Sequence, residues 1–180
     1  SFAYGKHSTM DHVANYFVKV EDKNGLVTQP NKNLALLKAD HIVLGYEKRI
    51  GANHIAKLET YYQNLYDLPV ENDVKSYYST INEISGFKKV ALVSEGKGKN
   101  YGVELTLERF FSQNYYYLFT TSLYQSKYIA KDGIERNTIY NNNYAFNFLI
   151  GKEFVNIGKK QNKTFGINAK LLYVGARKII

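Results

Sequence analysis

The sequence YGVELTLERFF, which spans residues 101–111, alternates between apolar and polar side chains. Its apolar positions are Val103, Leu105 and Leu107. The polar positions between and after them are Glu104, Thr106 and Glu108. Because successive side chains of a β-strand point to opposite faces, this pattern predicts a strand with one apolar and one polar face.

The same period of two recurs along most of the chain, in segments rich in the β-branched and aromatic residues that favour strands. These further segments are residues 2–7, 40–50, 54–66, 115–128, 144–154 and 164–176. Helical periodicity is weak, and only residues 11–20 are compatible with a short helix. The chain is therefore predicted to be all-β, an antiparallel up-and-down meander of about 6–7 strands.

The predicted connections alternate between short and long. The short ones are residues 51–53, 112–114 and 156–163, and the long ones are residues 8–39, 67–99 and 129–143. Every second connection of a meander lies at the same end, so one end carries tight turns and the other carries long loops. This asymmetry is typical of a transmembrane β-barrel. The alternating runs, about 10 to 13 residues each, also match tilted membrane strands better than the shorter strands of globular sheets.

Composition narrows the class of protein. The 180 residues carry a net charge of +8, with 17 tyrosines, 10 phenylalanines and no cysteine. Without cysteine there are no disulfides, thiolate zinc clusters or cysteine nucleophiles. The mean hydropathy is −0.39, and no stretch approaches the roughly 20 apolar residues of a membrane helix. A soluble β domain and a membrane β-barrel both remain open, because alternating strands do not raise hydropathy.

Aromatic residues gather near the ends of the predicted strands. They are Phe110, Phe111, Tyr115, Tyr116, Tyr117, Tyr128, Tyr144, Phe154 and Tyr173. Membrane barrels place girdles of aromatic rings at the headgroup level. Cross-strand packing in a soluble sheet also explains such rings, but not their concentration near strand ends.

If the apolar face meets lipid, the polar face lines an interior, and its charged residues are structural groups of that lumen. They are Glu47, Arg49, Lys57, Glu59, Glu104, Glu108, Glu153 and Lys170. Turns centred near residues 52 and 114 predict which residues face each other across neighbouring strands. The predicted pairs are Glu47 with Lys57, Glu108 with Thr120, and Glu104 with Tyr124.

No motif for catalysis or metal binding is found in the sequence. The four histidines are scattered, without carboxylates at the spacing of metal ligands. Glu104 and Glu108 lie four residues apart on a strand, roughly 13 Å, which is too far for glycoside hydrolysis. No enzyme activity, cofactor or metal is therefore expected. A nucleic-acid partner is not expected either, because the lysines are spread over loops and turns, and anionic headgroups would suit the charge as well.

Several segments resemble the barrel of TonB-dependent outer-membrane receptors of the Bacteroidetes type. They are GKNYGVELTLERFF (98–111), residues 118–128, DGIERNT (132–138), residues 142–154, HIVLGYE (41–47) and ETYYQNLYDLPV (59–70). The resemblance implies a 22-stranded barrel that is closed by a plug domain. Such receptors import scarce nutrients, namely siderophores, cobalamin or oligosaccharides, with energy delivered through the periplasmic TonB protein.

By this resemblance, residues 1–180 are a partial barrel domain from which the plug, the N-terminal region and the C-terminal strands are absent. The expected location is the bacterial outer membrane, and the expected partners are outer-membrane lipid, a nutrient and TonB. Five polar loop residues are candidate ligand contacts, with packing inside the loop as the other interpretation: Arg136, Tyr140, Asn141, Asn142 and Asn143. Two alternatives stay open, a soluble cell-surface β-sheet binding module and an outer-membrane barrel without a transport function.

Overall fold

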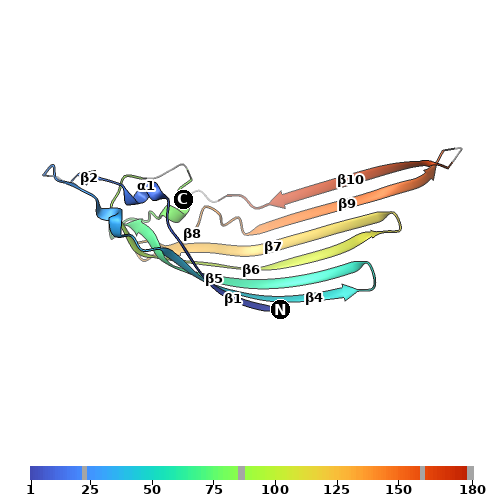
Figure 1. The fold of residues 1–180 in the computed structure, drawn as a ribbon, viewed down its shortest axis with the longest axis horizontal. Coiled ribbons are helices and arrows are strands. Elements are labelled where there is room, and N and C mark those ends of the chain that lie inside the picture. The colour runs from blue at the N-terminus through green and yellow to red at the C-terminus, as the bar shows by residue number, and fades with distance from the viewer. Residues whose placement is uncertain (22–23, 85–87, 159–160, 178–180) are drawn as a thin grey trace.

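The computed structural model describes residues 1–21, 24–84, 88–158 and 161–177. In these residues the main sheet has eight strands, in the order β1-β4-β5-β6-β7-β9-β10, with β8 paired to β7 (Figure 1). The strands are β1 (Phe2–Thr9), β4 (Leu37–Ile50), β5 (His54–Glu71), β6 (Leu92–Ser112), β7 (Tyr115–Ile129), β8 (Glu135–Asn137), β9 (Tyr144–Ile157) and β10 (Lys163–Val174). All pairs are antiparallel, so the predicted all-β meander is confirmed.

The smaller elements lie in the long connections, at the end of the sheet opposite the tight turns (Figure 1). They are α1 (Val13–Tyr16), β2 (Val20–Glu21), β3 (Val27–Thr28), and the 3₁₀ turns η1 (Pro30–Asn33) and η2 (Thr80–Asn82). Within residues 11–20, the segment compatible with a short helix, the structure has a single helical turn. Among the residues that the structure describes, no helix has the length and apolar character needed to cross a membrane.

The two faces of the sheet differ as the alternation predicts. One, the apolar face, carries Ile42, Leu44, Tyr46, Leu58, Tyr62, Val103, Leu105, Leu107, Phe119, Leu123, Phe146, Phe148, Ile150, Leu171 and Tyr173, which the strand register places side by side. Much of this face is exposed in the described chain: Leu44 is 54% exposed, Tyr46 65% and Leu171 66%. The opposite, polar face carries all eight charged residues that were predicted for a lumen.

The predicted pairing of Glu47 with Lys57 is confirmed. The two pairs predicted between β6 and β7 are wrong by two residues, since Glu108 faces Leu118 and Glu104 faces Ser122. One residue of the error comes from the turn, which is centred between Gln113 and Asn114. Both turn residues have positive φ, 53° and 66°, as a two-residue hairpin turn of type I′ requires.

The second residue of the error comes from a register shift between Arg109 and Ser112, just before this turn. Such a bulge inserts one extra residue into a strand and leaves little trace in the hydrophobic pattern.

β5 and β6 extend further than the alternation predicts, and the connection between them is correspondingly shorter than residues 67–99. β5 continues to Glu71 and β6 begins at Leu92. The register shifts between Leu65 and Leu68, next to Asp67, whose φ is 59°. This bulge breaks the alternation while the strands keep pairing beyond it, so the sequence pattern ends before the strand does.

At the loop end the polar face becomes apolar, and the long connections fold over it. Ala39, Leu65 and Leu68 form one buried cluster there, and Val70, Tyr128 and Ala130 form a second, with Ile81 packed against both. These clusters are the main buried core that the structure describes. They anchor the loops to one end of the sheet and leave the rest of the polar face open.

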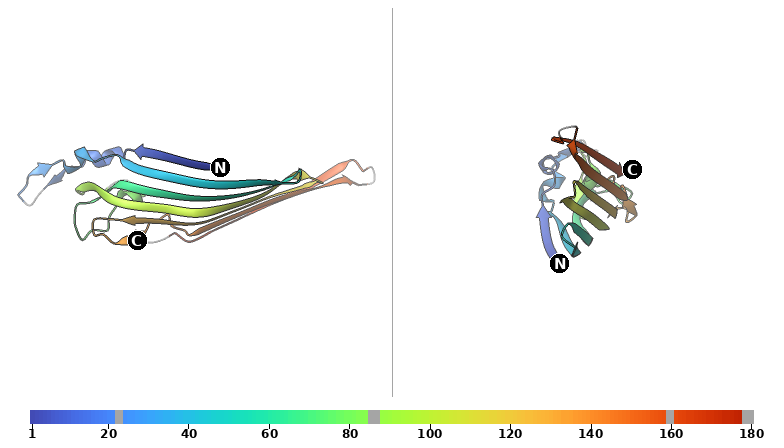
Figure 2. Two further views of the ribbon diagram at one scale, coloured as in Figure 1. Left: turned by 90° about the horizontal axis from the view of Figure 1, so that it is seen from below. Right: turned by 90° about the vertical axis from the view of Figure 1, so that its right-hand side faces the viewer.

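Figure 2 shows that the strands curve along their length and that β1 and β10 lie at opposite margins of the sheet. Among the described strands, β1 pairs only with β4, and β10 pairs only with β9. The sheet therefore remains open, with one free margin along each of these two strands.

Candidate functional site

Three rows of cross-strand neighbours form the centre of the polar face, across β4, β5, β6 and β7. The rows are His41, Gln63 and Asn100; Val43, Tyr61, Gly102 and Tyr124; and Gly45, Glu59, Glu104 and Ser122. We call these residues, together with Asn147 on β9, the central trough. The two-residue period of five paired strands places all of these side chains on one face.

The trough consists of three adjoining hollows of about 400, 400 and 350 Å³. Tyr61 lines the first two, and Glu104 borders the hollow at His41 and the hollow at Asn147. Because neighbouring hollows share lining residues, they form one continuous surface that crosses five strands, from β4 to β9.

Gly102 makes room for the tyrosines of the trough. A Cβ atom at this position would lie 2.7 Å from the Leu123 carbonyl oxygen and 2.9 Å from Oη of Tyr61. With glycine there, the rings of Tyr61 and Tyr124 can approach the backbone of β6 from either side. The ring of Tyr61 also meets His41 edge-on, with centroids 6.4 Å apart.

The trough carries an excess of negative charge. Glu59 and Glu104 face each other directly across β5 and β6. Lys57 Nζ lies 2.7 Å from Oε2 of Glu59, whereas Glu104 accepts a hydrogen bond of 3.3 Å from the Ser122 hydroxyl. In the described residues Glu59 thus has a close ammonium and Glu104 has none, so the surface suits a ligand with a positive charge or hydroxyl donors.

Amide side chains add further acceptors. Asn100 Nδ2 donates to Gln63 Oε1 at 2.7 Å. Within the described chain, Oδ1 of Asn100 and Oδ1 of Asn147 are buried without a hydrogen-bond partner. Buried acceptors of this kind normally find a partner, so a shift of the neighbouring side chains would let either oxygen accept a donor from water or from a ligand.

The structure groups only half of the predicted lumen residues. Glu47, Lys57, Glu59 and Glu104 are neighbours in the centre of the polar face. The other four lie apart, nearer the tight turns or on the last two strands: Arg49, Glu108, Glu153 and Lys170. In the described part of the chain, no ion pair is recorded for these four.

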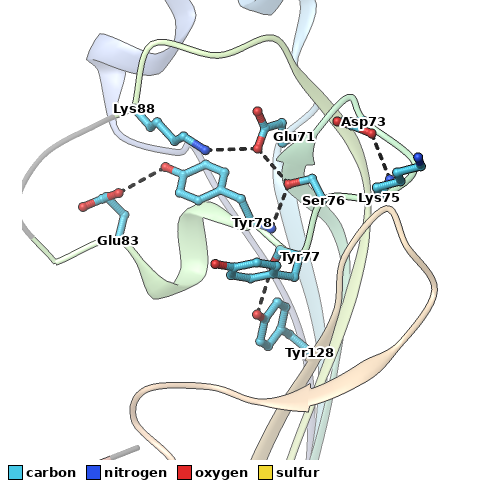
Figure 3. Close-up of polar contacts among 9 residues, drawn as sticks. All are labelled: Glu71, Asp73, Lys75, Ser76, Tyr77, Tyr78, Glu83, Lys88 and Tyr128. Carbon is cyan, nitrogen blue, oxygen red and sulfur yellow. Dashed lines mark hydrogen bonds and ion pairs between the residues drawn. The ribbon is translucent and has the colours of Figure 1, made fainter. Parts of the chain in front are cut away.

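The connection between β5 and β6 is held by polar contacts (Figure 3). Glu71 Oε2 accepts from Ser76 Oγ at 2.7 Å and from Lys88 Nζ at 3.1 Å. The Tyr78 hydroxyl donates to Glu83 Oε2 at 3.2 Å. Burial and the nearby Glu83 carboxylate raise the pKa of Tyr78, so its phenol stays protonated as a donor.

The same connection is tied to the sheet and to the next loop. The Tyr128 hydroxyl donates to the Tyr77 carbonyl at 3.0 Å, and the Ile139 amide donates to Asn82 Oδ1 at 3.1 Å. The two long connections therefore form one preformed layer beside the trough.

Among the five candidate loop residues, Arg136 and Asn141 hold the loop together. Arg136 pairs with Asp132 at 2.6 Å, and its guanidinium lies over the Tyr77 ring. Asn141 is fully buried. Its Oδ1 accepts from the Ser126 amide, and its Nδ2 donates to Gln125 and Asn137. Neither side chain is free to hold a ligand without rearrangement.

The remaining three candidates are more available. Tyr140 is 47% exposed, with Arg177 over its ring. Asn142 keeps a buried Oδ1 for which no partner is found in the described residues. Asn143 has a φ of 70° and borders the hollow that Tyr61 and Tyr124 line. These three residues lie near the point where the loop meets the trough.

Replacing Asp132 with asparagine is expected to loosen the turn before β8. The Arg136 guanidinium, which is hydrogen-bonded to Asp132, holds the pKa of that carboxyl below its ordinary value. A lowered folded-state pKa stabilises the fold above the ordinary value, and this contribution is lost as pH falls through the folded-state value. Amide protection of residues 133–137, corrected for intrinsic exchange, should therefore drop as pH falls below about 4.

In D132N this protection should already be low at neutral pH and should not respond to acid. An acid response of equal size in both proteins would contradict the role of Asp132.

Sequence reasoning missed the uncharged members of the trough as a site, chiefly Tyr61, Gln63, Asn100, Tyr124 and Asn147. The alternation of apolar and polar residues correctly predicted that these side chains lie on the polar face. Their adjacency was not readable, because it depends on strand register, and the register between β6 and β7 contains the bulge.

The described residues contain no cluster of three or more histidine, cysteine, aspartate or glutamate side chains that could hold a metal ion. No protein-family model, curated protein or solved structure matches the chain.

Proposed function

We propose that this chain forms part of the wall of an outer-membrane β-barrel that takes up a scarce nutrient, as a TonB-dependent receptor does. One observation carries the proposal, namely the broad exposed apolar face that lies back to back with the polar trough. Exposed apolar surface costs about 25 cal/mol per Å² in water, and contact with lipid removes that cost. A polar interior behind a lipid-facing wall is the arrangement of membrane barrels.

The polar side supports the uptake part of the proposal. The trough offers carboxylates, amide oxygens and tyrosine rings, and the preformed loop layer adds Tyr140 and Asn142 next to it. Such groups suit a nutrient rich in hydroxyl or cationic groups, and siderophores, cobalamin and oligosaccharides all present polar groups of this kind. The wall binds and guides the nutrient without chemistry, and the periplasmic TonB protein supplies the energy.

The location tests the proposal first. After cell lysis, the protein is expected to stay in the outer-membrane fraction through alkaline carbonate extraction and to enter solution only with detergent. Recovery in the aqueous phase without detergent would contradict the membrane-barrel proposal and favour the soluble binding module.

Nutrient-limited growth tests uptake. Cells that lack the gene are expected to fail on one limiting source of iron, cobalamin or glycan. Normal growth on all three, with the protein in the outer membrane, would favour a barrel without a transport function.

A further inference from the structure

Three cations mark the tight-turn end of the apolar face: Lys48 on β4, Arg109 on β6 and Lys152 on β9. Each lies two residues beyond the last aliphatic or aromatic residue of the central apolar run on its strand, namely Tyr46, Leu107 and Ile150. The three cations are therefore the first charged groups met on leaving the apolar band toward the turns.

These cations lie on a line that is oblique to the strands. A row of cross-strand partners connects Ile50, His54, Arg109, Tyr117 and Ile150. Relative to this row, Lys48 is displaced by two residues toward the loops and Lys152 by two residues toward the turns. β4 and β6 are two strands apart, and so are β6 and β9. The line thus shifts by one residue for each strand crossed.

The slope of this line has a physical meaning. One residue rises about 3.3 Å along a strand, and neighbouring strands lie about 4.8 Å apart, so the line is inclined by about 35° to the perpendicular of the strands. Strands of closed barrels tilt by about 35–45° from the barrel axis. In a wall with that tilt, the three cations lie at one depth, parallel to the membrane plane.

The charge of this line is not neutralised by the chain. In the described residues none of the three cations has a carboxylate within ion-pair distance. Arg109 is only 6% exposed, and its guanidinium lies 4.0 Å from the centroid of the Tyr115 ring and is hydrogen-bonded to His54, the Ser112 carbonyl and Gln113. Lys48 and Lys152 are exposed, and Lys152 lies 5.2 Å from the centroid of the Phe154 ring.

Most cations near the loop end of this face are paired instead, with Lys97 as an exception among the described residues. Lys38 binds Asp67 at 2.9 Å, and Lys99 and Lys127 both bind Glu135. In the described residues, cations without an ion pair on the apolar face are thus more numerous at the tight-turn end, with Lys48, Arg109 and Lys152 there against Lys97 at the loop end.

We propose that the exposed Lys48 and Lys152, on either side of the buried Arg109, form a headgroup site for anionic phospholipids of the leaflet at the tight-turn end. The inference rests on the proposed membrane location. Phosphate oxygens there meet the two exposed ammonium groups at one depth, and the buried Arg109 adds its positive charge between them, while the apolar residues above contact the acyl chains. Attraction between basic side chains and anionic lipid is electrostatic and acts over about one Debye length.

Tryptophan reporters can test the site, because the chain has no native tryptophan. Tyr117→Trp places one beside Arg109, and Tyr62→Trp places another near the loop end of the same face. The protein is reconstituted in phosphatidylcholine vesicles that contain brominated phosphatidylglycerol or brominated phosphatidylcholine as quencher. We expect the reporter at 117 to prefer phosphatidylglycerol about fivefold, because two or more cations lie near it. The reporter at 62 should show no preference.

A matched pair of charge variants shows which cations cause the preference of the reporter at 117 for phosphatidylglycerol. K48Q/K152Q should abolish the preference at 117, and K38Q/K127Q, which removes the same charge from the loop end, should leave it unchanged. Arg109 is kept in both variants, because it also donates to the Ser112 carbonyl and holds the turn. Equal quenching by both lipids at 117, or an equal loss of preference in both variants, would overturn the headgroup site. If neither lipid quenches either reporter, the membrane location itself fails.

Discussion

Replacing Leu58 with lysine is expected to lower the free energy of unfolding of the membrane-inserted protein by about 2–4 kcal/mol, the cost of a basic side chain near the middle of a lipid-facing barrel wall. Leu58 is 45% exposed and lies between Tyr46 and Leu105 in the centre of the apolar face. In a soluble protein an exposed leucine accepts lysine within about 0.5 kcal/mol. The size of the effect therefore separates a lipid environment from water.

Urea unfolding of the protein in phospholipid vesicles measures this difference. Thr120→Lys is the matched control, because Thr120 lies on the polar face and pairs with Thr106 and Asn147. We expect the control to unfold within about 0.5 kcal/mol of the parent. If the two variants are equally stable, the apolar face does not contact hydrocarbon.

The second large effect is expected at Gly151. Tyr116 faces this glycine from β7, and Asn168 faces it from β10. The Tyr116 hydroxyl donates to Asn168 Oδ1 at 2.9 Å, so the ring crosses over Gly151. A Cβ atom at Gly151 would lie 2.2 Å from Cε1 of Tyr116 and 2.3 Å from Oδ1 of Asn168. Gly151→Ala must displace the ring and break this hydrogen bond, at a cost of about 1–3 kcal/mol.

Gly166→Ala provides the comparison, since it lies on the neighbouring strand and the same face. There the nearest atom to an added Cβ is Cγ of Glu153, at 3.9 Å. Denaturation in the same vesicles should show a clear loss for the first variant and little change for the second. Similar losses would mean that alanine harms these strands through the backbone and not through the Tyr116 contact.

Much of the architecture was predictable from the residues, for identifiable reasons. The face on which each side chain of a strand lies follows from a period of two, and Val103, Leu105 and Leu107 show this period clearly. The pairing of Glu47 with Lys57 followed from a short turn without a bulge in either strand. Where bulges occur, beside Asp67 and before Ser112, the same logic fails, since one extra residue changes the register and leaves hydrophobicity unchanged.

The candidate site was less predictable than the sheet. The roles of Arg136 and Asn141 depend on which partners the folded loop brings to them, and those partners come from several segments. Asn141, for example, is held by Ser126 and Gln125 on β7. Composition identified the polar loop, but only three-dimensional packing separates a structural asparagine from one with a free acceptor.

The free margin along β10 leaves backbone hydrogen-bonding groups of this strand without partners in the described sheet. This strand has 12 residues, and every second one directs its N–H and C=O groups away from β9, which leaves about six donor and six acceptor groups facing outward. In hydrocarbon each unsatisfied group costs several kcal/mol. The total is tens of kcal/mol, well above the roughly 5–15 kcal/mol by which folded domains are stable. In a bilayer this margin therefore requires another strand to bond with it.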